Sequence, residues 1–136
     1  MSIEKLEIEN YYDLLGLHKA LLEAKFHKNP ENIEVCFSPI IAKISNEIVE
    51  ILMKKDAEKD ASKKDSWEKW RRLENKSYFR ECALSNAASF HYWKDMNYEQ
   101  KLVACRNLLS PFVATSSEIE LFIQEVDDSI NKKEVN

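Results

Sequence analysis

The sequence predicts an all-α protein, and its composition and apolar patterning both support that fold class. The 136 residues include one glycine and three prolines, so the tight turns of β-sandwiches and barrels lack the residues that they need. Glycine-rich phosphate loops are excluded for the same reason. Apolar residues also recur at spacings of three and four, which is the period of a helix. We therefore expect a single domain over residues 1–136, built as an antiparallel bundle of about five helices.

The first predicted helix covers residues 11–28. Its inward face carries apolar side chains and one histidine: Tyr11, Leu14, Leu15, His18, Leu21, Leu22 and Phe26. Asn10 is suited to cap the start, and the proline after Asn29 ends the helix. Gly16 lies on the opposite face, where it either allows a close helix contact or is a tolerated cost of about 1 kcal/mol relative to alanine.

Residues 30–38 are predicted to be an extended connector, because their apolar side chains alternate along the chain: Ile33, Val35 and Phe37. Ser38 and Pro39 then begin the second helix. Its predicted inward face is entirely aliphatic: Ile40, Ile41, Ile44, Ile48, Ile51 and Leu52. After Met53 the apolar residues stop, and the charged run 54–65 is predicted to be either a solvated extension of this helix or a linker.

A third helical region spans residues 66–94, and its apolar faces do not stay in phase. One face carries Phe79, Cys82, Ala83, Asn86, Phe90 and Trp93. In a continuous helix Trp67, Trp70 and Leu73 would point about 180° away from that face. We therefore expect either a break near residues 75–77 or burial of these side chains against something other than the main core.

Two more helices complete the predicted bundle. Asn97 and Gln100 form a capping box before a helix that ends ahead of Pro111. Its inward side chains are Tyr98, Leu102, Cys105 and Leu109. Ser117 and Glu120 are predicted to open the last helix. The inward face of that helix carries Ile119, Phe122, Ile123, Val126 and Ile130.

The sequence predicts neither a secreted nor a membrane protein. It has no secretion signal and no apolar stretch long enough to span a bilayer, so a cytoplasmic location is expected. Cys36, Cys82 and Cys105 lie far apart and are expected to be free, buried thiols.

No motif predicts enzymatic chemistry, and no cofactor or metal site is expected. Helical zinc and di-iron motifs and the nucleophile elbow are missing from the sequence. Glu23 and His27 are one helical turn apart, and we interpret them as a solvent-facing contact rather than a metal site. His18 and His91 lie among apolar and aromatic residues, so we interpret both as packing residues.

Residues 63–80 form a basic island between two acidic flanks. The island has seven basic and three acidic residues, although the whole chain has a net charge of -4. It mixes aromatic and cationic side chains: Trp67, Trp70, Arg71, Arg72, Lys76, Tyr78 and Arg80. Such residues are enriched at protein-binding hot spots and also stack on nucleic-acid bases. The competing interpretation is that both tryptophans pack into a core groove formed by the first two helices.

The last predicted helix carries an acidic group of residues: Glu118, Glu120, Glu125, Asp127 and Asp128. Negative charge in the first turn suits a helix N-terminus, which accounts for Glu118 and Glu120. Glu125, Asp127 and Asp128 lie nearer the C-terminal end of the helix, where negative charge is unfavourable. A basic partner would account for them, whether that partner is the chain's own island or a separate molecule, and an ordinary solvated face remains the alternative.

These features favour a non-enzymatic protein-binding module. Small acidic inhibitors of nucleases, including bacterial immunity and antitoxin proteins, share this profile, because an acidic surface speeds association with a basic toxin. The predicted partner-binding residues are Trp67, Trp70, Arg71, Arg72 and Tyr78 together with the five acidic residues of the last helix. The alternative is nucleic-acid binding through residues 63–80, which the sequence pI near 5.5 disfavours. The partner's identity and the oligomeric state are left open.

Overall fold

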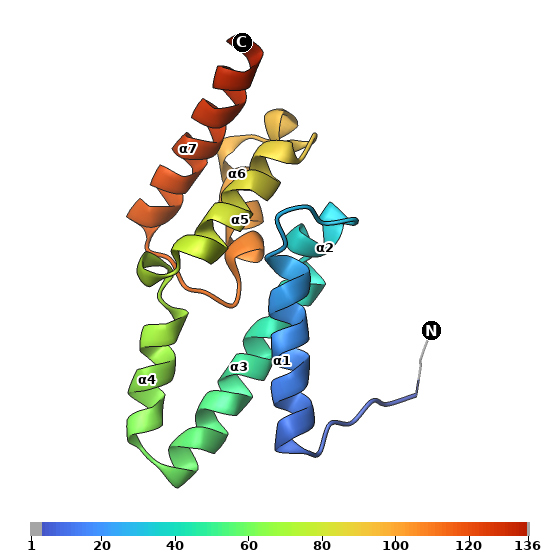
Figure 1. Cartoon of the computed structure of the whole chain (residues 1–136), viewed down its shortest axis with the longest axis vertical. Coiled ribbons are helices and arrows are strands. Elements are labelled where there is room, and N and C mark those ends of the chain that lie inside the picture. The colour runs from blue at the N-terminus through green and yellow to red at the C-terminus, as the bar shows by residue number, and fades with distance from the viewer. Residues whose placement is uncertain (1–3, 136) are drawn as a thin grey trace.

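The computed structural model describes residues 4–135, which form seven α-helices, two short 3₁₀ helices and no strand (Figure 1). The elements are α1 (Tyr11–Lys25), α2 (Ile33–Phe37), α3 (Pro39–Lys59), α4 (Ser62–Arg71), η1 (Leu73–Asn75), α5 (Ser77–Ser89), η2 (Trp93–Asp95), α6 (Tyr98–Leu109) and α7 (Ser116–Val135). The all-α prediction is confirmed, with seven helices in place of about five.

The first additional helix is α2, which replaces the predicted extended connector. Asn32 caps it, because its side chain accepts a hydrogen bond from the backbone N–H of Glu34 at 3.1 Å. The alternation of apolar residues was therefore misleading. Cys36 and Phe37 are buried in one short helical turn rather than on one face of a strand.

The second additional helix is α4, which begins inside the charged run 54–65. The preceding helix, α3, extends into this run as far as Lys59, and α4 begins at Ser62. Asp60 makes the corner by accepting hydrogen bonds from the backbone N–H of Ser62 at 3.0 Å and from its hydroxyl at 2.8 Å. The run is thus mostly helical, with a tight turn in its middle.

Of the two expectations for the out-of-phase region, the break near residues 75–77 is present. The chain leaves α4 at Arg71, passes through η1 and re-enters a helix at Ser77. Backbone pairing with the α6–α7 loop holds this junction: Val113 N–H donates to the carbonyl of Arg71 at 2.7 Å, and Leu73 N–H donates to the carbonyl of Val113 at 3.2 Å. The long out-of-phase region is therefore two helices, of which α5 has a buried face and α4 has none.

Capping explains where the last two helices begin. The capping box predicted for α6 is present. For α7 the box is formed by Thr115 and Glu118, each donating a backbone N–H to the other's side chain at 2.9 and 3.2 Å. The predicted pair of Ser117 and Glu120 was two residues too late.

Figure 1 shows an elongated molecule with two halves. The upper half contains α2, α5, α6 and α7, and the lower half contains α1, α3 and α4, with α3 antiparallel to both of its neighbours. The fully buried side chains of the upper half include Cys82, Ala83, Ala87, Trp93, Cys105, Leu108, Phe122 and Val126. In contrast, α4 has no buried residue. None of the described helices has the length and apolar character needed to cross a membrane.

The aliphatic face predicted for α3 is only partly the buried one. Ile48 and Leu52 are buried as predicted, but Ile40, Ile44 and Ile51 are exposed: Ile40 by 68%, Ile44 by 38% and Ile51 by 46%. Small side chains, those of Ala42 and Ser45, are buried instead. Small residues let neighbouring helices approach closely, so the helix is rotated relative to the face that hydrophobicity alone selects.

Lys25, the last residue of α1, is fully buried and ties the two halves together. Its ammonium donates to the backbone carbonyl of Asn107 at 2.8 Å and to that of Ser110. These carbonyls belong to the C-terminal end of α6, where intrahelical partners are missing. Burial lowers the pKa of Lys25 to about 7, against the opposing influence of the nearby Cys36.

Candidate functional site

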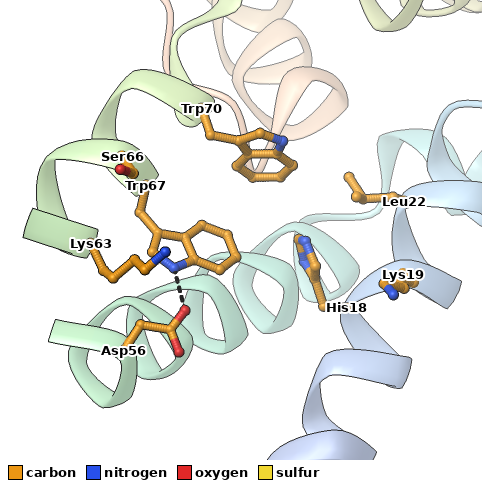
Figure 2. A pocket seen from close by; sticks show the side chains of 8 residues that line it. All are labelled: His18, Lys19, Leu22, Asp56, Lys63, Ser66, Trp67 and Trp70. Atoms are coloured by element: carbon orange, nitrogen blue, oxygen red, sulfur yellow. Dashed lines mark hydrogen bonds between the residues drawn. The ribbon is translucent and has the colours of Figure 1, made fainter. Parts of the chain in front are cut away.

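A cleft with a volume of about 450 Å³ lies between α1, α3 and α4 in the lower half. Figure 2 shows side chains from all three helices around it. They are His18, Lys19, Leu22, Asp56, Lys63, Ser66, Trp67 and Trp70. Sites for small molecules or single anchoring groups are commonly about 300–1,000 Å³ in volume and mostly apolar with a few polar groups. This cleft has that size and that mixture.

The position of α4 sets the width of the cleft, and one residue fixes its C-terminal end. Arg71 donates from Nε to the carbonyl of Pro111 at 3.0 Å and from Nη2 to the side-chain oxygen of Asn46 at 3.0 Å. The α4 helix is thereby held at its end without burying a side chain of its own. Its aromatic residues are left to face the cleft.

Three aromatic rings form one wall of the cleft. The ring centroids of His18 and Trp67 are 5.8 Å apart, those of His18 and Trp70 are 5.3 Å apart, and those of the two tryptophans are 5.4 Å apart. All three pairs meet edge to face, the preferred arrangement of aromatic quadrupoles. Because the rings contact one another, they form a continuous wall and leave no space between them.

Asp56 holds the three helices around the cleft together. One carboxylate oxygen accepts a hydrogen bond from the hydroxyl of Tyr11 on α1 at 2.8 Å, and the other accepts from the indole N–H of Trp67 on α4 at 2.8 Å. The pKa of Tyr11 is raised, first by its hydrogen bond to Asp56 and then by burial. The carboxylate charge of Asp56 is thus already met by two donors on neighbouring helices.

His18 is the most deeply buried polar side chain of the cleft, with 5% of its surface exposed. Its Nδ1 atom is itself buried and has no hydrogen-bond partner among the described residues. Burial lowers the pKa of His18, and the adjacent Lys19 lowers it further, so the ring is mainly neutral at pH 7. Leaving a buried nitrogen without a partner costs free energy, and a ligand in the cleft does not reach this one.

Lysines dominate the charge around the cleft. Lys19 of α1 and Lys63 of α4 line it, and the Nζ of Lys76 lies 5.4 Å from the ring centroid of Trp70. The carboxylate of Asp56 faces the same space but is occupied by its two donors. The cleft therefore presents positive charge to an incoming group, although the whole chain is acidic.

The structure brings Trp67 and Trp70 together at this cleft and separates them from other predicted site residues. Both indoles are half-buried, and Trp70 reaches the edge of the core, where its ring centroid is 4.9 Å from that of Phe112. The guanidinium of Arg71 is engaged in its hydrogen bonds to the Pro111 carbonyl and the Asn46 side chain. Arg72 is exposed beside the cleft helix, and Tyr78 lies on α5 with 55% of its surface exposed.

The α7 helix that carries the acidic residues lies in the upper half (Figure 1), whereas the cleft is lined by residues of α1, α3 and α4. Glu118 caps its own helix, and Glu125 pairs with Arg80 at 2.7 Å, so the basic island partly neutralises this helix from within the chain. Asp127 accepts hydrogen bonds from Trp93 at 2.8 Å and Lys101 at 3.0 Å. The carboxylates of Glu120 and Asp128 are exposed.

Asp56, Lys63 and Lys19 are the cleft residues that sequence reasoning missed. Asp56 belongs to a charged run in which nearly every residue is hydrophilic, so its two internal hydrogen bonds leave no mark on the pattern. His18 was interpreted as a core residue, and its burial confirms that, but its unpartnered nitrogen and its neighbours depend on tertiary packing. The unusual phase of Trp67 and Trp70 was the one available indication of this site.

The described residues contain no group of three or more potential ligands that could hold a metal ion. All three cysteines are buried, as predicted, and burial raises the pKa of Cys105 to about 12, so this thiol is a poor nucleophile. No protein-family model matches the chain, and no curated protein or solved structure matches it. Interpretation of the cleft therefore rests on its own residues.

Proposed function

We propose that this protein is a non-enzymatic protein-binding module whose contact surface is centred on the cleft between α1, α3 and α4. The observation that carries this proposal is the placement of Trp67. Its ring lies on a helix without buried residues and lines an open cleft, although tryptophan is normally buried in a core. Tryptophan and arginine dominate binding hot spots, and Arg72, the residue that follows α4, is exposed.

The form of binding that the composition favours is inhibition by surface contact, as in immunity and antitoxin proteins. Asp128 on α7 is exposed and available for a basic partner, and Glu120 is exposed while interacting with the Tyr98 hydroxyl. Glu118, Glu125 and Asp127 already have partners inside the chain. The cleft is consequently the better-supported centre of the interface, and the acidic helix is a second contact that adds to it.

Affinity capture with matched variants tests this function. Immobilised wild-type protein, Trp67→Ala and Tyr92→Ala are exposed to a lysate of the native cells, and bound proteins are quantified by mass spectrometry. Tyr92 is an exposed aromatic residue of the upper half, so it is the matched control. A true partner is retained by wild type and by Tyr92→Ala and weakened about 30-fold by Trp67→Ala, the effect of losing a hot spot worth about 2 kcal/mol. Equal retention by all three variants contradicts the proposal.

Nucleic-acid binding through residues 63–80 is the second candidate, favoured by the lysines around the two tryptophans. Lys76 lies over Trp70, and Lys63 lines the cleft, an arrangement suited to stacked bases and phosphates. Against it, Arg71 and Arg80 are held by contacts within the chain. Retention on mixed-sequence single-stranded DNA that falls steeply with salt and is lost in Lys63→Gln/Arg72→Gln supports this alternative.

A further inference from the structure

We infer that the cleft between α1, α3 and α4 binds an aromatic group that carries a carboxylate, presented by the partner protein as an aromatic side chain beside an acidic group. This inference rests on the proposed protein-binding function and specifies the chemistry of the contact. It differs from the sequence-based expectation of a basic partner. Two observations support it: the aromatic wall and the lysines that line the cleft.

The wall selects an aromatic or flat apolar group. Two indoles and one imidazole form a continuous surface, with Leu22 beside it, and neighbouring rings prefer to meet in offset or edge-to-face contacts. The volume of about 450 Å³ accommodates a ring with its attached groups. A whole helix of the partner does not fit, because a helix with its side chains is about 10–12 Å in diameter.

The charges around the wall select an anion. Lys19 and Lys63 line the cleft, while the two oxygens of Asp56 already accept hydrogen bonds from Tyr11 and Trp67. A carboxylate approaching the wall therefore meets two ammonium groups and one carboxylate that is already satisfied. Partner and cleft are then complementary in charge, which favours fast and specific association.

The geometry argues against a cationic ligand. Aromatic cages for quaternary ammonium groups surround the cation with ring faces. Here the three centroids are 5.3 to 5.8 Å apart and the rings touch, so no cation can lie between them. The two lysines would also repel it.

His18 contributes an aromatic ring to the wall and no polar contact that a ligand reaches. The residue is 5% exposed, and its Nδ1, which has no hydrogen-bond partner among the described residues, is itself buried. The preference for an acid therefore depends on the lysines around the cleft.

Three matched probes test the inference: N-acetylphenylalanine, its amide and phenethylamine, which carry negative, zero and positive charge on similar bodies. Each is titrated into the ¹⁵N-labelled full chain at low salt, and the indole N–H signals are followed by NMR. The signals are assigned from Trp67→Phe, Trp70→Phe and Trp93→Phe. Trp93 is the internal control, because it is fully buried in the upper half.

The expected result is that the acid shifts the Trp67 and Trp70 signals and leaves Trp93 unchanged. The acid should bind about threefold to fivefold more tightly than the amide, as expected for exposed ion pairs worth up to about 1 kcal/mol. Lys19→Gln/Lys63→Gln should remove that preference. Lys64→Gln, an exposed neighbour that does not line the cleft, should retain it. His18→Phe, which keeps a ring in the wall and leaves both lysines in place, should retain it as well.

The inference is overturned if the amide or the amine binds as tightly as the acid, if no probe shifts Trp67, or if Lys64→Gln has the same effect as the double variant. The outcome is separable from that of the capture experiment. Acid selectivity without any Trp67-dependent protein capture leaves this chemistry standing and refutes the protein-binding function. Trp67-dependent protein capture without acid selectivity supports the protein-binding function and refutes the inferred ligand chemistry.

Discussion

The two halves of the molecule contain the same local interaction in different surroundings. In the upper half the indole N–H of Trp93 donates to Asp127 at 2.8 Å, and in the lower half that of Trp67 donates to Asp56 at 2.8 Å. Trp93 is completely buried, whereas Trp67 is half-buried and lines a cleft. The indole hydrogen bond has the same length in the two pairs, so the difference lies in how the rest of each ring is packed and in the second donor, which is Lys101 for Asp127 and Tyr11 for Asp56.

This comparison indicates which tryptophan contributes to stability and which is available for binding. Trp93 is surrounded by core residues, and Lys101 closes over its ring at 5.3 Å while also bonding to Asp127. Trp67 has ring contacts on one side and open volume on the other. The exposed apolar part of the Trp67 ring can be buried by a partner without breaking the indole hydrogen bond. That burial would lower the free energy of the complex.

The largest expected difference between the halves is in the cost of truncating these tryptophans. Trp93→Ala should lower the free energy of unfolding by about 3–5 kcal/mol, because it leaves a large cavity and removes one of the two donors to Asp127. Trp67→Ala should lower the free energy of unfolding by only about 1–2 kcal/mol, since the Trp67 ring is half-buried at an open cleft. Urea denaturation followed by circular dichroism measures both. Equal losses would remove the distinction between the halves.

Lys25, which is buried where the two halves meet, should make the free energy of unfolding depend on pH. Its pKa is about 7 in the folded protein and about 10.5 in the unfolded chain, so the unfolded state binds more protons between these pH values. The stability of wild type relative to Lys25→Met should therefore rise by about 2 kcal/mol from pH 7 to pH 9. Denaturant unfolding of both proteins at the two pH values measures this. A difference that stays constant with pH would show that Lys25 is not buried as described.

Gly16 provides the smallest test, on the outer side of the lower half. No atom lies within 4 Å of the position that a Cβ would occupy there, so the close helix contact considered from the sequence is absent among the described residues. Gly16→Ala should stabilise the protein by about 0.5–1 kcal/mol. Ala20→Gly, at an exposed position of the same helix, should destabilise it by a similar amount. A destabilising Gly16→Ala would indicate that another surface packs against this face.

The sequence predicted the fold class, the break between α4 and α5 and the capping box of α6, because these depend on local chemistry. It did not predict which face of α3 is buried, since isoleucines occur around much of that helix and the small Ala42 and Ser45 decide the packing. Asp56 was equally unpredictable. Its partners, Tyr11 and Trp67, come from helices on either side of it, and their meeting is set by tertiary structure.

Collisional quenching of single-tryptophan variants tests the central claim most directly. With the other two tryptophans replaced by phenylalanine, the fluorescence of Trp67 should be quenched by iodide, and more strongly by iodide than by caesium, because Lys19 and Lys63 attract the anion. The fluorescence of Trp93 should be quenched by neither ion. If Trp67 is shielded from iodide as fully as Trp93, the cleft is closed in solution, and the account of the lower half as a binding surface is wrong.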